Sequence, residues 1–193
     1  MFKPTKRIEG AHDEGIWAVK WKGEHICSGS LDGTVKLWRQ NLSLSATSSP
    51  KKLGITSVSI LNNLSMVISC CQDSTIEFHD ISDFNSTQMI RPGLLEAWTI
   101  SVSPDDSLIA GGSQAGAINV WSLQDKNKVA SFETGNNFIT DTAFSPAGDK
   151  IAAVGVDGML NIFDMQGTKC IFQSEAHALP VRCVRFSADG KLV

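Results

Sequence analysis

The segment SGSLDGTVKLW, residues 28–38, carries the strongest structural signal in this chain, because variants of it recur three times. Each copy places small residues before a tight turn and ends in a short apolar run: SCCQDSTIEFH at 69–79, GGSQAGAINVW at 111–121 and AVGVDGMLNIF at 153–163. The turn positions lie 41, 42 and 42 residues apart, at Asp32, Asp73, Ala115 and Asp157. A regular period of this length predicts an array of similar units.

Each unit is expected to contain short antiparallel strands. In the first unit, β-branched and aromatic residues predict strands at 16–21, 25–30 and 34–38. Equivalent first strands are predicted at 55–60, 97–102, 139–144 and 181–186. Turns rich in Ser, Pro, Asp and Gly follow three of these strands, at 103–106, 145–149 and 187–190. The Ser-rich segment 40–52 lacks a clear strand pattern and is expected to contain a short fourth strand and a loop.

A period near 42 residues with four short strands is typical of one blade of a WD-repeat β-propeller. The predicted fold class is therefore all-β, a single propeller domain over residues 1–193 with four blades and the start of a fifth. The predicted blades cover 11–50, 51–92, 93–134, 135–175 and the truncated 176–193. Seven blades would need about 300 residues, so the chain is incomplete relative to a seven-bladed ring.

Composition argues against several other classes of protein. The chain has 17 Lys and Arg against 20 Asp and Glu among 193 residues, without a basic run that would suit nucleic acid. No apolar segment approaches the roughly 18 residues of a membrane span. The five cysteines are odd in number and lack paired C-x-x-C spacing, which argues against a disulfide framework or a zinc site. We expect a soluble, intracellular protein without metal or cofactor.

His12, Ser28, Asp32 and Trp38 match the structural tetrad of WD-repeat blades, in which a loop His, a turn Asp, a Ser (here Ser28 or Ser30) and a Trp are hydrogen-bonded. The same residues offer a Ser-His-Asp triad, but neither oxyanion donors nor a nucleophile elbow accompany them. We therefore predict a structural role and no enzymatic activity. The tetrad is degraded in the other blades, by Lys51, Gly93 and Gly135 at the His position, Ala115 at the Asp position, and His79 and Phe163 at the Trp position.

The first strand of each blade lines the centre of a propeller and is predicted to alternate between core and variable positions. The predicted core positions are Ile16, Val19 and Trp21; Ala97, Ile100 and Val102; Ile139, Thr142 and Phe144; and Val181, Val184 and Phe186. In the family pattern one variable position faces the narrow top of the ring, where this chain has Trp17, Thr56, Trp98, Thr140 and Arg182. Because Trp and Arg often anchor interfaces, the candidate partner-binding face is Trp17, Gln72, Glu96, Trp98, Gln114, Phe138 and Arg182. The alternative is that Trp17 and Trp98 belong to the core.

Four stretches, at 11–21, 95–123, 138–169 and 175–193, resemble the WD-repeat subunits of superkiller complexes, which in animals also occur in the Paf transcription-elongation complex. This resemblance implies a non-catalytic adaptor, present in cytoplasm and nucleus, that binds a tetratricopeptide-repeat subunit and with it an RNA helicase of cytoplasmic mRNA decay. It also implies Paf-complex subunits as nuclear partners, with no direct contact to nucleic acid or membrane. The alternative is a WD-repeat recognition module of another assembly, such as a ubiquitin-ligase substrate receptor or a histone-tail reader.

Overall fold

The computed structural model describes residues 6–135, 137–167 and 169–193, which contain sixteen strands in four antiparallel sheets. Residues 1–5, 136 and 168, which the predicted domain also includes, lie outside the described residues. The first sheet has β1 (Ile16–Lys22), β2 (His25–Ser30), β3 (Val35–Arg39) and β4 (Leu44–Thr47). The second has β5 (Ile55–Ile60), β6 (Met66–Cys71), β7 (Ile76–Asp80) and β8 (Ser86–Ile90). The third has β9 (Thr99–Val102), β10 (Leu108–Gly112), β11 (Ala117–Ser122) and β12 (Lys128–Glu133). The fourth has β13 (Ile139–Phe144), β14 (Lys150–Gly155), β15 (Met159–Asp164) and β16 (Lys169–Glu175).

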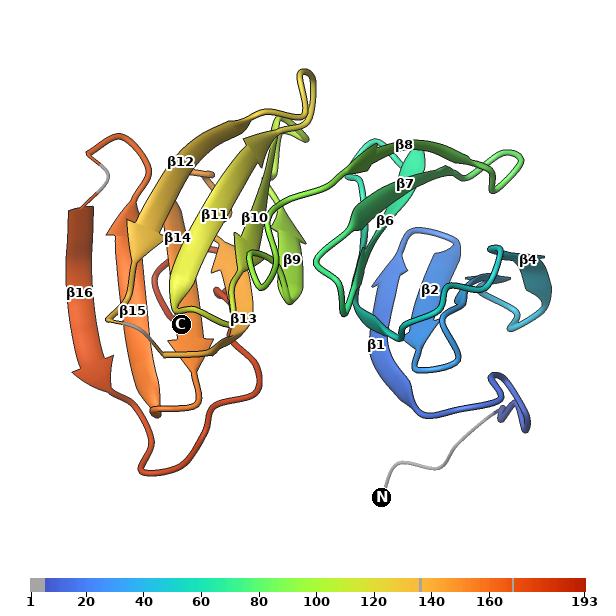
Figure 1. Ribbon diagram of the computed structural model, residues 1–193, viewed down its shortest axis with the longest axis horizontal. Coiled ribbons are helices and arrows are strands. Elements are labelled where there is room, and N and C mark those ends of the chain that lie inside the picture. The colour runs from blue at the N-terminus through green and yellow to red at the C-terminus, as the bar shows by residue number, and fades with distance from the viewer. Residues whose placement is uncertain (1–5, 136, 168) are drawn as a thin grey trace.

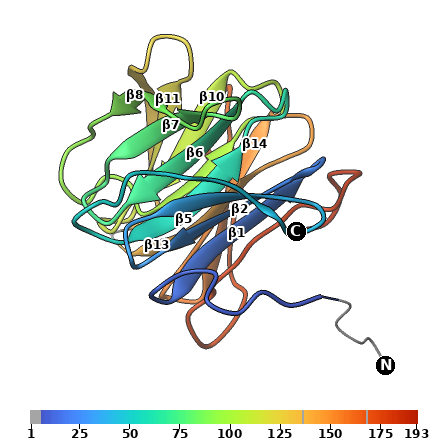
Figure 2. The same ribbon diagram turned by 90° about the vertical axis from the view of Figure 1, so that its right-hand side faces the viewer.

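Every sheet is a meander in which each strand pairs with the next along the chain. The first strands β1, β5, β9 and β13 contact one another in sequence, so the four sheets follow one another along an arc around a shared inner edge (Figures 1 and 2). The prediction of an all-β propeller with four blades is confirmed. The Ser-rich segment contains the short strand β4.

The strand predicted at 181–186 is not formed, and this part of the prediction is wrong. A strand needs a hydrogen-bonded neighbour, and the residues that follow, up to 193, form a turn rather than a second strand. The segment is nevertheless held beside β13. Val181 N–H donates to Gly155 O at 3.1 Å, Val184 N–H donates to Asp141 Oδ2 at 3.0 Å, and Thr140 Oγ1 donates to Val181 O.

The hydrophobic core lies between neighbouring blades. The first strand of each later blade packs on the blade before it: Ile55, Val58 and Ile60 lie against Cys27, Val35 and Leu37 of the first blade. In the same way Ala97 and Ile100 lie against the second blade, Ile139 against the third and Val184 against the fourth. Each blade therefore depends on its neighbour to remove its apolar face from water.

Strand β1 is the exception, and the prediction that its apolar residues Ile16, Val19 and Trp21 are buried is wrong. Ile16, Val19 and Trp21 are 46%, 62% and 60% exposed, whereas the equivalent Ile55, Val58 and Ile60 of β5 are buried. The physical reason is that, in the described part of the chain, no sheet packs on the side of β1 that carries these residues.

The turn between the second and third strands explains why the repeat is so regular. Gly33, Gly116 and Gly158 all adopt positive φ angles there, of 77°, 88° and 77°. A Cβ on Gly33 would lie 2.3 Å from the carbonyl oxygen of Lys51, so a side chain is excluded by contact as well as by backbone conformation. In the second blade Ser74 takes the position at φ 69°, and its hydroxyl accepts a hydrogen bond from Ala97 N–H at 3.2 Å.

Candidate functional site

The first blade is held by a continuous chain of polar contacts. His12 Nδ1 lies 2.9 Å from Asp32 Oδ2, and His12 Nε2 lies 2.7 Å from Ser28 Oγ. Trp38 Nε1–H donates to Ser28 Oγ at 2.9 Å. Because an ionised carboxylate only accepts hydrogen bonds, His12 donates to Asp32 and accepts from Ser28. The four predicted tetrad residues are therefore brought together, linking the entering loop to the second and third strands.

The electrostatics of Asp32 follow from these contacts. Desolvation by burial raises the pKa of Asp32, but hydrogen bonds from Thr34, His12 and Asp13 outweigh it and hold the pKa well below its usual value. Ser28 is buried and is engaged by both His12 and Trp38. A serine in this position has no open approach for a substrate, which supports a structural role for the group.

The second blade replaces this network with a different one. Lys51, at the His position, pairs with Glu77 Oε1 at 2.5 Å rather than with Asp73. His79, at the Trp position, lies 3.0 Å from Ser69 Oγ through Nε2 and stacks on Phe84 with 5.3 Å between ring centroids. Burial lowers the pKa of His79, although the Glu77 carboxylate opposes this shift. In the second blade the residue at the His position is therefore held by Glu77 of the third strand and not by the turn Asp.

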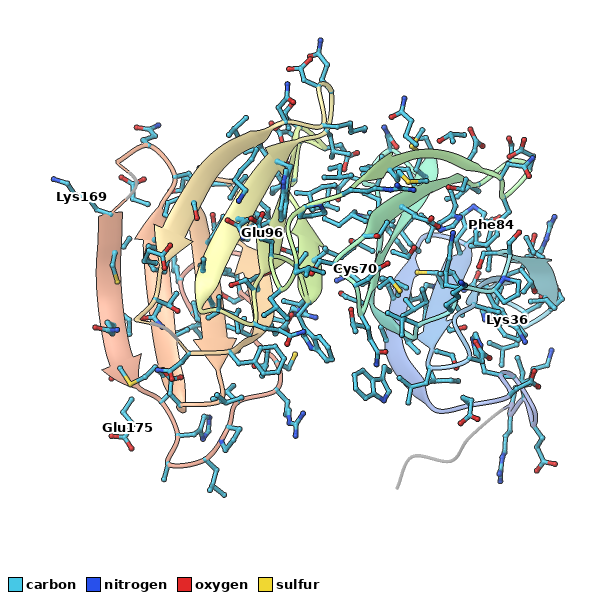
Figure 3. All side chains as sticks on the ribbon, in the orientation of Figure 1. Lys36, Cys70, Phe84, Glu96, Lys169 and Glu175 are labelled. Carbon is cyan, nitrogen blue, oxygen red and sulfur yellow. The ribbon has the colours of Figure 1, made fainter. Side chains whose placement is uncertain are left out.

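The sequence did not predict that one position of the third strand also contacts the loop that enters the blade. Lys36, Glu77, Asn119 and Asn161 are spaced by the repeat, 41, 42 and 42 residues apart. Lys36 Nζ (labelled in Figure 3) donates to Ala11 O at 2.6 Å, and Asn119 Nδ2 donates to Glu96 O at 3.0 Å. In the fourth blade Asn161 Oδ1 instead accepts from Gln173 Nε2, while Asn137 Nδ2 donates to Asp157 Oδ2. The spacing was the available signal, but the differing chemistry of the four residues concealed it.

Three of the predicted partner-binding residues form one aromatic cluster. Ring centroids of Trp17 and Trp98 lie 5.5 Å apart, and those of Trp98 and Phe138 lie 5.2 Å apart with their planes at 80°. These side chains come from the first, third and fourth blades, at the rim where the chain enters β1, β9 and β13. We call this rim the top face and the three residues the aromatic cluster. Trp17 is 49% exposed, and the other two are half-buried.

Thr56 is the second blade's residue at the equivalent position, and its role is different. Its hydroxyl donates to Trp98 O at 2.6 Å, and Thr140 donates to Val181 O in the same way. Thr56 thereby connects β5 to the residue that precedes β9, and Thr140 connects β13 to the segment that lies beside it.

The remaining predicted residues of the top face are placed separately. Gln72 Oε1 accepts from Gly54 N–H at 3.4 Å, and the backbone N–H of Gln114 donates to Leu95 O. Glu96 (Figure 3) pairs with Lys128 Nζ at 2.7 Å. Arg182 is exposed and lines the central cavity between the inner strands.

Other kinds of site find little support within the part of the chain that the structure describes. It holds no group of three or more His, Cys, Asp or Glu suited to a metal ion. All five cysteines are free, and burial raises the pKa of Cys27 and of Cys70 to about 12, which disfavours the reactive thiolate. Among the same residues no helix is long and apolar enough to cross a membrane.

Comparisons with known proteins agree with this architecture. The profile of the WD domain, G-beta repeat, matches residues 2–39, and that of the anaphase-promoting complex subunit 4 WD40 domain matches residues 99–189. The WD repeat-containing protein SL1-17 of Schistosoma mansoni is 32% identical over 98% of this chain and 66% of its own length. Superkiller complex protein 8 of Dictyostelium discoideum is 33% identical over 49% of this chain and 33% of its own length.

The β-propeller domain of Cps50 (Swd1) from Myceliophteria thermophila, a solved structure, superimposes with a TM-score of 0.80 at 18% identity. The match covers 93% of this chain and 61% of that one. The chain thus spans 66% of the length of SL1-17 and 61% of the Cps50 domain.

Proposed function

Because the chain belongs to the WD-repeat β-propeller family, we propose that it is a non-catalytic protein-interaction scaffold whose partner binds the top face over the aromatic cluster. The observation that carries this proposal is the contact of Trp17, Trp98 and Phe138, contributed by three different blades. Aromatic side chains that are partly exposed and contiguous are the usual anchors of a protein interface.

The geometry of the cluster suits a preformed site. Trp98 packs between Trp17 and Phe138, and its carbonyl is fixed by Thr56. Rigid rings that are already in place lose little conformational freedom when a partner binds, so more of the contact energy remains as affinity. We therefore expect each residue of the aromatic cluster to contribute strongly to the free energy of partner binding.

The partner that we propose follows from the resemblance to superkiller WD-repeat subunits. On this proposal the protein joins a tetratricopeptide-repeat subunit and an RNA helicase in cytoplasmic mRNA decay, and joins Paf-complex subunits in the nucleus. The 33% identity to superkiller complex protein 8 over 99 residues supports this assignment.

The test is to purify the tagged protein from cells and to identify the proteins that accompany it by mass spectrometry. A tetratricopeptide-repeat protein together with a helicase, or Paf-complex subunits, is the expected result. A cullin adaptor or a histone recovered in their place would overturn the assignment to these complexes and indicate a recognition module of another assembly.

A further inference from the structure

The inner strands line a partly open cavity of about 340 Å³ whose charge is unlike that of the rest of the molecule. Lys20, Lys22, Arg182 and Arg185 all line it, and Asp141 is the one carboxylate among its described lining residues. The whole chain, by contrast, has a formal net charge of −3. Positive charge is therefore concentrated at the centre of the arc.

The repeat places two of these cations at the same level of the cavity. Lys20, Ser59, Ser101, Ala143 and Arg185 occupy equivalent positions of the five inner segments, and all of them line the cavity. The three middle positions carry small side chains, while the first and last carry long cationic ones. The result is an open space lined by two serine hydroxyls and an alanine methyl group, with a cation at each end of the arc.

The carboxylate of Asp141 leaves part of this positive charge unbalanced. Its Oδ1 accepts from Thr99 Oγ1 and Thr142 N–H, while its Oδ2 accepts from Val184 N–H and Arg185. Asp141 thus neutralises Arg185 and is fully occupied. Within the described residues Lys20 Nζ has no hydrogen-bond acceptor, although Lys20 is half-buried.

We propose that this cavity binds a compact multivalent anion bearing phosphate groups, with Lys20 as its principal ligand and Arg182 as a second cationic group. An ammonium group and a guanidinium group that line the same cavity as serine hydroxyls match the several oxygens of such an anion. The volume suits a small anion rather than a polymer. Burial and the nearby charge of Arg185 lower the pKa of Lys20, so a bound anion would also stabilise its charged form.

The experiment is calorimetric titration of the protein with inorganic pyrophosphate at constant ionic strength. We expect saturable binding that Lys20→Gln weakens by at least about tenfold, as expected for the loss of a charge-assisted contact. The matched control is Lys169→Gln, which removes the same charge from the exposed outer strand β16 (Figure 3) and should leave the affinity within about twofold. A parallel titration with a phosphoserine peptide tells whether a free anion or a modified protein is the preferred source.

Two further measurements keep the proposal open to refutation. Lys20→Arg keeps the charge and should bind within about threefold of the parent protein, and the denaturation midpoint of Lys20→Gln without anion should not fall. The proposal is overturned if pyrophosphate gives no saturable heat. It is also overturned if Lys20→Gln and Lys169→Gln change the affinity equally.

Discussion

The first and second blades have the same strand order but secure their entering loops with different polar groups. In the first blade His12 joins Asp32 to Ser28, and Trp38 completes the chain. In the second blade Lys51 pairs with Glu77, while His79 fills the Trp position and bonds Ser69. The backbone pairing is nevertheless equivalent, with Ser28 opposite Lys36 and Ser69 opposite Glu77.

The blade geometry therefore does not depend on one particular set of polar residues. Apolar packing between blades and the strand ladders position the backbone, and the buried polar atoms then need partners of some kind. The replacement of Trp by His leaves one buried polar atom unsatisfied, because His79 Nδ1 has no hydrogen-bond partner within the described chain. We therefore expect the first blade to depend more on its Trp than the second depends on its His.

The largest effect is expected from Trp38→Ala. Trp38 is buried and donates to Ser28, so its removal creates a cavity and should lower the free energy of unfolding by about 3–5 kcal/mol. The equivalent change in the second blade, His79→Ala, removes a smaller side chain and one hydrogen bond and should cost about 1–3 kcal/mol. Urea titration of both variants checks this order, and an equal loss would contradict it.

Lys51→Met should follow in size, because it leaves the carboxylate of Glu77 buried without its partner. Breaking a buried pair is costly, but Lys51 is about one third exposed, so we expect a loss of about 2–3 kcal/mol. The double variant Lys51→Met with Glu77→Gln should recover most of it, since no buried charge remains. The control Lys52→Met changes an exposed side chain and should stay within about 0.5 kcal/mol. Failure of the double variant to recover stability would argue against the pair.

Asp32→Asn tests the first network through its dependence on pH. Because the folded-state pKa of Asp32 is below the unfolded value of about 3.9, the unfolded chain binds more protons in acid. The stability that Asp32 contributes is therefore present above about pH 4 and is lost as the pH falls further. The variant should lose about 1–2 kcal/mol at pH 6 and less at pH 3, measured by chemical denaturation. A loss that does not change with pH would contradict the account.

The smallest effect is expected from Val19→Ala, which tests the contrast between the two inner strands. Val19 is 62% exposed, so its truncation should change the free energy of unfolding by less than about 0.5 kcal/mol. Val58 occupies the equivalent position of β5 and is buried, and Val58→Ala should cost about 1–3 kcal/mol. Similar losses for the two variants would mean that the outer side of β1 is covered in solution.

The repeat allowed much of the fold to be predicted, because strands such as β2, β5 and β13 combine apolar residues with turn residues at their ends. The strand predicted at 181–186 is not formed, because a strand also requires a hydrogen-bonded neighbouring strand. The local sequence does not show whether such a neighbour is present. The candidate site shows the same limit. The spacing placed Trp17 and Trp98 at equivalent positions of different blades, but it did not indicate that their rings are in contact. The contacts of Lys36, Glu77 and Asn119 with the entering loops could not be predicted, because each residue uses a different functional group.

We propose that the aromatic cluster binds a partner while the tetrad maintains the first blade. The most direct test measures partner affinity and denaturant stability for Trp98→Ala and Trp38→Ala side by side, with the partner that co-purifies with the protein. We predict that Trp98→Ala weakens binding by about 2 kcal/mol or more. It should cost the fold less than the roughly 3–5 kcal/mol expected for a fully buried Trp, the loss predicted for Trp38→Ala. Unchanged binding by Trp98→Ala, together with a large loss of stability, would contradict the claim and assign Trp98 to the core.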